Sequence, residues 1–476
     1  RKVIKLVLSG MQSTNFPVSY PEQNKIKNEY MKILWGKIEE RTRITTRNFV
    51  GPSSFTLQIS NIAPKNDDTI IPNIRDNYTV TDKADGDRKL LFISENGKIY
   101  LIDTNMNIQF TGAKTTNAEV FNTIIDGEHI LRDKTGKFIN LYAAFDIYYI
   151  NNSDKRGLLF APVGELNSKE YESSNFRLYI LHNVILVLKP TSVIRGDEVS
   201  PIRIDVKTFQ MSTDTQTIFQ ACDKIIKRVK DNAIEYETDG LIFTPGLLPV
   251  GGSKPGKPGK PVKSTWDHSF KWKPVEFNTI DFLVTLKKNT DGKDLIGNIF
   301  ENGTDTGSVI QLTQYKTAEL RVGFDTKSHG YINPCLDIIN DNIPENDNSD
   351  NSEGYRPVQF YPTNPSDSKA GICNILLHPT GTGDKVMLSE SEEVIEDNMI
   401  VEFRYDINGK DGFKWIPLRV RYDKTAELRG GGRQYGNAYH VANSNRHSIH
   451  NPITEEMITS GDDIPDELGD DDIYYN

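Results

Sequence analysis

Short apolar or alternating runs, separated by turn residues, recur along most of this 476-residue chain. The runs "KLLFIS" and "KIYLID" flank the tripeptide "ENG", which is typical of a hairpin turn, and "IQFTG" follows closely. Runs of this length and spacing predict antiparallel strands. Helical spacing of apolar residues within 19–45 and within 216–232 predicts a few helices beside them. We therefore expect an α+β fold.

Changes in composition divide the chain into four parts. Residues 1–48 are expected to form a helical segment, and residues 49–277 a domain of antiparallel sheets with flanking helices. Strand-like runs over 278–424 predict a small all-β barrel domain. An acidic, polar stretch near 338–354 interrupts it and is expected to be a disordered insert. Residues 425–476 are rich in Gly and Asn, then acidic, and are expected to form a linker.

Charge and cysteine content limit the classes of function. The chain carries 56 Lys and Arg against 66 Asp and Glu, a net charge of -10, so any contact with nucleic acid must use a local basic groove. Cys222, Cys335 and Cys373 lie far apart without zinc-site spacing, which predicts reduced structural thiols. No apolar run is long enough to span a bilayer, so we expect no membrane partner.

The stretch "TDKADGDRKLLF" concentrates charge immediately before an apolar run. Ala84 and Gly86 permit a tight turn, which would hold Lys83 and Arg88 beside a phosphate. A lysine there could act as a nucleophile if its pKa fell by ~3 units, which corresponds to ~4 kcal/mol and is within reach of neighbouring cations and desolvation. The alternative is a solvated, charged β-turn.

Four further motifs place side chains of related chemistry at strand ends. They are Asp126 and Glu128 in "IIDGEHI", Phe145 and Asp146 in "AAFDIYYI", Glu237 and Asp239 in "ETDGLIF", and Lys271 and Lys273 in "FKWKP". The three acidic sites could converge on one sheet face to bind a divalent cation and ribose hydroxyls. The two lysines, two residues apart on one strand, point the same way and could neutralise a phosphate. Taken singly, each motif is more typical of a turn or a solvated strand face.

The order of these motifs, completed by "WIPLRVRYDK", resembles the covalent nucleotidyltransferase superfamily. Within it, the chain resembles the guanylyltransferase region of the multifunctional mRNA capping enzymes of large cytoplasmic DNA viruses, the poxvirus and giant-virus type. The likeness runs from Phe49 to Lys424. It implies an ATP-grasp-like ligase and capping fold for the nucleotidyltransferase domain, followed by an OB-fold barrel domain.

The resemblance also implies a role for each motif residue. Lys83 would be the catalytic nucleophile that forms a phosphoamide bond with GMP. The other implied contacts are Arg88 with the ribose, Glu128 with the sugar and the metal, Phe145 with the guanine ring, Lys207 of "RIDVKTFQ" with guanine O6, Asp239 with the metal, Lys271 and Lys273 with the α-phosphate, and Arg421, Asp423 and Lys424 with the β- and γ-phosphates.

The function so implied is an mRNA guanylyltransferase that transfers GMP from GTP to the 5′ diphosphate end of RNA. Mg²⁺ or Mn²⁺ would be the cofactor, and the two domains would close for the first step and open for the second. Residues 1–48 would be the trailing part of an RNA triphosphatase domain, and 425–476 would lead to a cap methyltransferase domain, fused or associated. A cytoplasmic location, in a viral factory or virion, would follow for a protein of a large DNA virus.

Two other classes of function stay open at this point. An ATP-dependent polynucleotide ligase, acting on RNA or DNA, shares the lysine chemistry, and a catalytically dead RNA-binding scaffold could keep the fold alone. The loop "KPGKPGKPVK" is interpreted as a solvated linker rather than an RNA track. His440, His447 and His450 are likewise assigned to a polar linker, because no cysteines or regular ligand spacing accompany them.

Overall fold

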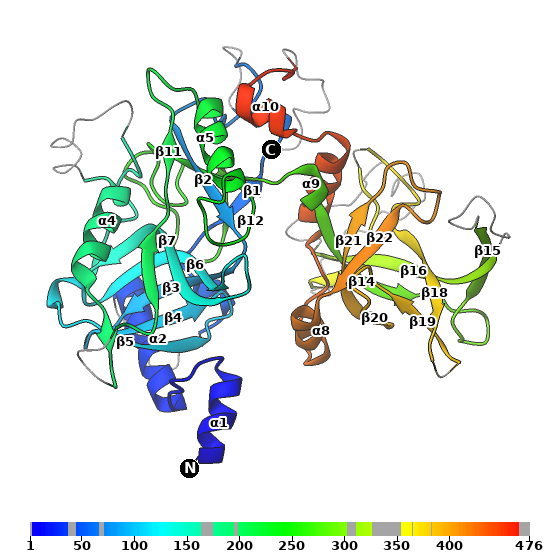
Figure 1. The fold of residues 1–476 in the computed structure, drawn as a ribbon, viewed down its shortest axis with the longest axis horizontal. Helices are drawn as coiled ribbons and strands as arrows, with labels where there is room; N and C mark the ends of the chain where they lie inside the picture. Colours follow the sequence, from blue (N-terminus) through cyan, green and yellow to red (C-terminus); the bar gives the residue numbers. More distant parts are fainter. Residues whose placement is uncertain are drawn as a thin grey trace, which may run out of the picture. The chain divides into compact units, whose positions relative to one another are not determined.

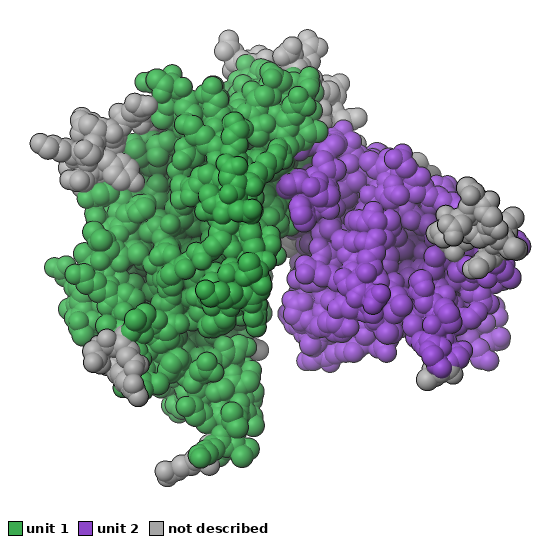
Figure 2. Space-filling model, viewed as in Figure 1, with its two compact units in different colours: residues 1–273, 454–469, 476 green, residues 274–453, 470–475 purple. Residues whose placement is uncertain are grey.

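The computed structural model describes residues 2–36, 44–65, 71–162, 175–194, 199–301, 311–325, 354–363, 365–381 and 383–465. The chain forms two compact units (Figure 1; Figure 2). Unit 1 comprises Arg1–Lys273 together with Thr454–Gly469, and unit 2 comprises Pro274–Ile453. Each unit has its own hydrophobic core, so each is described separately.

Unit 1 contains two sheets. The first, sheet A, has the strand order β1 (Ser53–Thr56), β13 (Thr265–Trp272), β12 (Thr238–Pro245), β2 (Tyr78–Ala84) and β11 (Gln210–Met211). The second, sheet B, has the order β10 (Arg203–Val206), β7 (Phe138–Ile150), β6 (Thr123–Arg132), β3 (Asp87–Ile93), β4 (Lys98–Asp103), β5 (Ile108–Lys114) and β9 (Thr191–Ser192), with β8 (Ser153–Asp154) paired to β7. Only the pairs β1·β13 and β10·β7 are parallel among the described strands. The predicted antiparallel sheets are therefore confirmed.

Helices cover both faces of sheet B, which explains why its strands read as nearly continuous apolar runs. Leu90 and Phe92 of β3 pack against helix α2 (Tyr20–Trp35), whereas Leu91 and Ile93 pack against helix α4 (Arg177–Leu188) (Figure 1). The alternation follows from the two-residue period of a strand. Neither face of this part of the sheet needs polar residues, because neither meets solvent.

Helix α2 begins and ends where its sequence directs. Ser19 is the N-cap and accepts a hydrogen bond from the backbone N–H of Glu22, a proline stands in the first turn, and Gly36 ends the helix at φ 75°. Its Tyr30 side chain is fully buried; the hydroxyl donates to Asn48 O at 2.8 Å and accepts from Val50 N at 3.0 Å. The helix is thereby tied to the segment that leads into β1.

The described residues of unit 1 form three more α-helices: α1 (Lys2–Met11), α5 (Ile218–Lys230) and α10 (Glu455–Ser460). Helix α5 packs on β2 with the apolar face that its periodicity predicts, and Thr217 and Gln220 form a capping box at its start. Helix α10 packs on α5, and Lys230 forms an ion pair with Glu455 between them.

Unit 2 is built on one strongly curved sheet. Its strand order is β20 (Val394–Ile395), β19 (Lys385–Leu388), β18 (Ile372–Pro379), β16 (Gln311–Phe324), β14 (Thr279–Leu286), β21 (Met399–Tyr405) and β22 (Trp415–Val420), and β15 (Ile296–Glu301) and β17 (Arg356–Gln359) also pair with β16. The end strand β22 returns to β18, where Cys373 Sγ lies 3.1 Å from Trp415 O, so the sheet is nearly a closed barrel. The predicted α+β class, with sheets followed by a barrel, is confirmed.

Residues 425–476, expected to form a linker, contain regular structure. Helix α8 (Tyr422–Arg429) and helix α9 (Tyr439–His450) belong to unit 2, and α10 belongs to unit 1. Buried Tyr439, Ala442 and Ile449 of α9 join the core of unit 2. Helix α4 in unit 1 was also not predicted from the sequence. The expected insert near 338–354 lies, up to residue 353, outside the described residues.

Candidate active site

Lys83 and Asp239 form the centre of the site. Lys83 lies near the end of β2 and donates to Asp239 Oδ1 at 2.5 Å; Asp239 lies on the neighbouring strand β12. The other carboxylate oxygen, Oδ2, is 2.7 Å from Lys273 Nζ, just past the end of β13. Burial alone would raise the pKa of Asp239, but the charges of Lys83 and Lys273 outweigh it and hold that pKa below its ordinary value. Asp239 is therefore an anion shared by two ammonium groups.

Lys271 differs from Lys273, because no carboxylate among the described residues forms an ion pair with Lys271. Burial, with the nearby charges of Lys273 and Lys83, lowers the pKa of Lys271 to about 8. A buried ammonium group without an anionic partner is costly. Lys271 is thus prepared to bind an anion that enters the site.

Glu128 supplies the second carboxylate of the site, from β6. Burial raises its pKa to about 7, although the charges of Lys207, Arg88 and Lys83 oppose the shift. Near neutral pH this side chain is therefore only partly ionised. A cation brought beside it would favour the ionised form.

Arg88 is held from behind by a fully buried carboxylate. Its Nη2 and Nε donate to Asp126 at 2.5 and 3.1 Å, and Nη1 donates to Pro52 O at 2.8 Å. The hydroxyl of Tyr148 also donates to Asp126. A guanidinium has five N–H donors, so two of those of Arg88 are left for a ligand.

Lys207 is almost completely buried, at 3% side-chain exposure, beside Asp82. Its Nζ lies 3.0 Å from Asp82 Oδ2 and also donates to the Asp82 carbonyl. Tyr236 OH donates to the same carboxylate at 3.1 Å. Because an ammonium group has three donors, one remains for the pocket.

Six of the residues to which the resemblance assigned a role line one pocket of unit 1, with a volume of about 310 Å³: Lys83, Arg88, Glu128, Phe145, Lys207 and Lys271. Asp146 lines it as well. Sheet A supplies the lysines at 83 and 271, and sheet B supplies Arg88, Glu128 and Phe145. Asp239 and Lys273 do not line the pocket themselves and join it through Lys83. The structure thus brings these side chains together. The roles assigned to them stay predictions.

Several residues of the pocket were missed from the sequence. Thr81, Thr244, Ser54 and Ser269 also line it, and the last two share a hydroxyl hydrogen bond of 2.8 Å. Strand alternation offers a signal for Thr81 and Ser269, because each lies two residues before a predicted lysine, Lys83 or Lys271, and so on the same face of its strand. Asp82, the partner of Lys207, was read only as part of a charged turn.

A buried ion pair supports the floor of the pocket. Arg177, the first residue of α4, is fully buried and donates to both oxygens of Asp146, at 2.8 and 3.1 Å. It also donates to the carbonyls of Leu158 and Leu248. Asp146, predicted as a possible ligand of a cation, is therefore committed to a structural partner.

The last predicted motif lies in unit 2 and is not part of this pocket. Arg421 Nη1 lies 2.8 Å from Asp281 Oδ2, and Lys424 Nζ donates to the same oxygen. Asp281 is 7% exposed, on β14, and was not singled out from the sequence. Asp423 is 69% exposed, and its Oδ1 lies 3.6 Å from Arg421 Nε.

The region around this pocket is similar to a known family. Residues 73–275 match the model of the family described as mRNA capping enzyme, catalytic domain. The predicted resemblance to capping enzymes is confirmed. The matched region contains every unit 1 residue that was assigned to the site, from Lys83 to Lys273.

Individual capping enzymes are similar over more of the chain. A probable mRNA-capping enzyme of Acanthamoeba polyphaga mimivirus is 27% identical over 94% of this chain and 36% of that protein. The mRNA-capping enzyme of Danio rerio is 25% identical over 63% of this chain and 44% of its own length. That of African swine fever virus, isolate Pig/Kenya/KEN-50/1950, is 24% identical over 81% and 35%. The chain thus spans less than half the length of these capping enzymes.

The described residues hold neither a membrane-spanning helix nor a cluster of metal-binding side chains. None of the helices there is both long and apolar enough to cross a membrane. In that same part of the chain, no group of three or more His, Cys, Asp and Glu side chains is placed to hold a metal ion. The histidines of α9 accordingly form no such group.

Proposed function

We propose that this chain is an mRNA guanylyltransferase, which transfers GMP from GTP through a lysyl intermediate to the 5′ diphosphate end of RNA. One observation carries the proposal. Lys83 opens into a pocket of nucleotide size beside Lys271, a partly buried cation that has no carboxylate partner in the described structure. Similarity to capping enzymes supports GTP, rather than ATP, as the nucleotide.

In the first step, the Lys83 amine attacks the α-phosphorus of GTP. A nitrogen–phosphorus bond forms, the bond between the α-phosphorus and the bridging oxygen breaks, and pyrophosphate leaves with its electron pair. Lys83 must first leave Asp239 and lose a proton, because an ammonium group in an ion pair has no free electron pair. The ion pair therefore represents the resting state.

Lys271 and Lys273 would stabilise the charge that develops on the α-phosphate. Lys271 is already desolvated, so a phosphate oxygen gains a full ionic partner there without displacing a protein carboxylate. Lys273 would follow once the α-phosphate competes with Asp239 for its ammonium group. Preorganised cations of this kind are a main source of catalysis in phosphoryl transfer.

The remaining side chains would position the nucleoside. Phe145 would stack on the guanine ring, the free donor of Lys207 would bind O6, and the two spare donors of Arg88 would bind ribose hydroxyls. All three side chains line the pocket, and each of the two cations is oriented by a buried aspartate. Their geometry is thus set before the nucleotide binds.

Glu128 and Asp239 would hold the divalent cation, Mg²⁺ or Mn²⁺. Magnesium is usually bound by one or two carboxylates together with substrate phosphates and water, so these two would suffice once Asp239 is released from Lys83 and Lys273. Bound there, it would offset negative charge on the phosphates. The raised pKa of Glu128 would then fall, because the cation favours the carboxylate.

The substrates and partners of the full reaction are also part of the proposal. Arg421, Asp423 and Lys424 of unit 2 would contact the β- and γ-phosphates and orient pyrophosphate as the leaving group. The diphosphate end of an RNA would then attack the lysyl-GMP phosphorus and release Lys83. RNA triphosphatase and cap methyltransferase activities, fused or associated, would act before and after this step.

The test is covalent labelling. The protein is incubated with magnesium and each α-³²P-labelled ribonucleoside triphosphate in turn, and the products are separated on a denaturing gel. We expect label from GTP alone, its loss in Lys83→Ala, and no change in Lys254→Ala, an exposed lysine of the loop before β13. Label from ATP instead of GTP would favour a ligase, and label that persists in Lys83→Ala would refute the assignment.

A further inference from the structure

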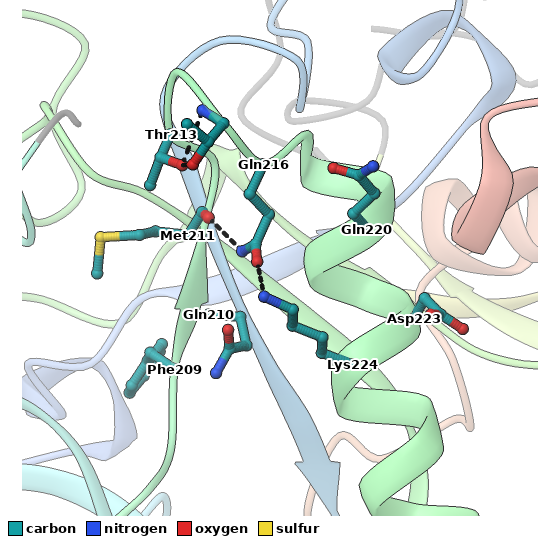
Figure 3. A pocket seen from close by; sticks show the side chains of 9 residues that line it. Phe209, Gln210, Met211, Thr213, Gln216, Gln220, Asp223 and Lys224 are labelled. Atoms are coloured by element: carbon teal, nitrogen blue, oxygen red, sulfur yellow. Dashed lines mark hydrogen bonds between the residues drawn. The ribbon is translucent and has the colours of Figure 1, made fainter. Parts of the chain in front are cut away.

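A second pocket of unit 1 lies between β11 and the first turns of α5, with a volume of about 570 Å³ (Figure 3). Phe209 lines both this pocket and the one that contains Lys83. No residue assigned to the reaction above belongs to it. It will be called the α5 pocket.

The α5 pocket lies close to the proposed reaction centre. Strand β11 pairs with β2 so that Gln210 is opposite Val80 and Met211 opposite Thr79. Lys83 is three residues beyond Val80, which is about 10 Å along a strand. A ligand that fills the α5 pocket is therefore too far away to react itself, but it can belong to a chain whose end reacts.

The lining suits a polar ligand with hydrogen-bonding edges. Gln210, Gln216 and Gln220 bring carboxamides, and Thr213 and Thr215 bring hydroxyls. Figure 3 shows Gln216 between the strand and the helix, where its Nε2 donates to Met211 O at 2.8 Å. The Gln210 carboxamide has no hydrogen-bond partner within the described part of the chain. Amides of this kind pair with the edges of unstacked bases.

The positive charge of the pocket is not neutralised. Lys224 extends from α5 across the pocket and donates to Gln216 Oε1 (Figure 3). The adjacent Asp223 is 2.6 Å from Lys227 one turn further on, so its charge is already paired. In the described structure no carboxylate pairs with Lys224, which leaves its ammonium group for an anion. A phosphate is such an anion.

An aromatic ring stands beside these groups. Phe209 is only partly buried and packs edge-on against Phe160, with ring centroids 5.1 Å apart and an interplanar angle of 69°. That contact holds the ring in place where the two pockets adjoin. A fixed aromatic ring, the free amide of Gln210 and one cation without a carboxylate partner are together the means by which proteins bind single-stranded RNA.

We propose that the α5 pocket is a subsite for the acceptor RNA, which binds a nucleotide a short way downstream of the 5′ diphosphate end. The inference rests on the function proposed above and adds a place for the second substrate. Lys224 would bind a phosphate of the RNA backbone, and Gln210 a base edge.

The experiment compares acceptor lengths in the Lys224→Ala and Gln210→Ala variants of the full chain. Formation of the lysyl-GMP intermediate needs no RNA, so we expect it to stay within twofold of the unaltered protein. The KM for a 5′ diphosphate hexanucleotide should rise about tenfold, whereas that for a nucleoside 5′ diphosphate, which has no downstream nucleotide to reach the α5 pocket, should not change. Lys230→Ala is the matched control on the same helix, because Lys230 does not line the α5 pocket and pairs with Glu455, and it should leave both KM values unchanged.

Equal effects on the two acceptors, or none on either, would overturn the subsite. Fluorescence anisotropy with a labelled hexanucleotide gives a readout that does not depend on catalysis: Lys224→Ala should weaken binding about tenfold. Excess GMP should not displace the RNA; displacement at low GMP concentration would show a free-nucleotide site and overturn the proposal. Failure of the unaltered protein to form lysyl-GMP, with RNA binding still weakened by Lys224→Ala, would refute the proposed function alone.

Discussion

A single carboxylate, that of Asp239, holds two of the lysines on which the proposed chemistry depends. Each of its oxygens accepts from one ammonium group, at 2.5 and 2.7 Å. The nucleophile and a phosphate-binding lysine are therefore brought together by one residue. Neither lysine would be drawn toward the other without it, because like charges repel.

Asp239→Asn tests that arrangement. An amide carries no charge and cannot pair with two ammonium groups, so Lys83 and Lys273 should separate. We expect lysyl-GMP formation, measured by label incorporation from GTP, to fall about 100-fold. Asp267→Asn is the control, since Asp267 lies on β13 with a 76% exposed side chain. An unchanged labelling rate in Asp239→Asn would contradict the role given to Asp239.

Glu128 predicts a specific dependence of stability on pH. Its folded pKa of about 7 lies above the unfolded value, so the folded protein binds the extra proton. The associated stability is fully present below about pH 4.5 and is lost as the pH rises through about 7. Glu128→Gln abolishes the titration. The difference in unfolding free energy, variant minus unaltered protein, should therefore increase as the pH rises from about 5 to about 7, by ~3 kcal/mol at most. Urea denaturation at each pH measures this difference. A constant difference over that range would contradict the shifted pKa.

At the scale of elements, helix α2 is part of the domain that contains the site. Its Tyr30 shares a core with Leu90 and Phe92 of β3, the strand that carries Arg88. The helix therefore supports the sheet behind the pocket. The assignment of residues 1–48 to a separate triphosphatase domain stays a prediction, and any such boundary would have to fall before α2.

Tyr30→Phe tests how strongly the helix is attached. The change leaves the buried N–H of Val50 and the carbonyl of Asn48 without their partner, which typically costs about 1–3 kcal/mol. Urea denaturation should show that loss, whereas Tyr20→Phe, the same change at a residue that is 61% exposed, should have almost no effect. Equal stability of the two variants would show that the hydroxyl of Tyr30 contributes little.

At the scale of the molecule, the proposed reaction draws on both units. All residues that line the pocket around Lys83 belong to unit 1. The motif that contains Arg421 and Lys424 belongs to unit 2. Those two cations are held by Asp281, so they are fixed in orientation and partly neutralised. Each unit has its own core, so loss of one motif need not unfold the other unit.

Arg421→Ala separates the two reaction steps. Pyrophosphate leaves in the first step only, so formation of lysyl-GMP should fall about 100-fold, consistent with the loss of a preorganised phosphate contact. Transfer of GMP from isolated intermediate to RNA should change much less. Arg404→Ala is the control, because Arg404 lies in the same unit and pairs with Glu390 at the surface. Equal losses in both steps would argue against a contact with the leaving group.

Much of this protein is determined locally, and the sequence alone therefore predicts it. Two-residue alternation and turn residues specify the strands, Ser19 and Gly36 delimit α2, and the order of short motifs around Lys83 indicates capping enzymes. Helix α4 was missed, because its run "RLYILHNVILVL" is apolar on all sides and so lacks the periodicity that marks a surface helix.

Only the tertiary structure decides which charges meet. From the sequence, Asp239 could have belonged to a β-turn, and Asp146 could have bound a metal cation. In the structure Asp239 pairs with Lys83, and Asp146 pairs with the buried Arg177. Asp82 and Asp281 carried no signal at all, because their partners Lys207, Arg421 and Lys424 are more than 100 residues away. Electrostatic interactions depend on distance in space and on burial, and neither is encoded by local spacing. The motifs themselves can be identified from the sequence. Which of their residues come into contact is determined by strand pairing in the tertiary structure.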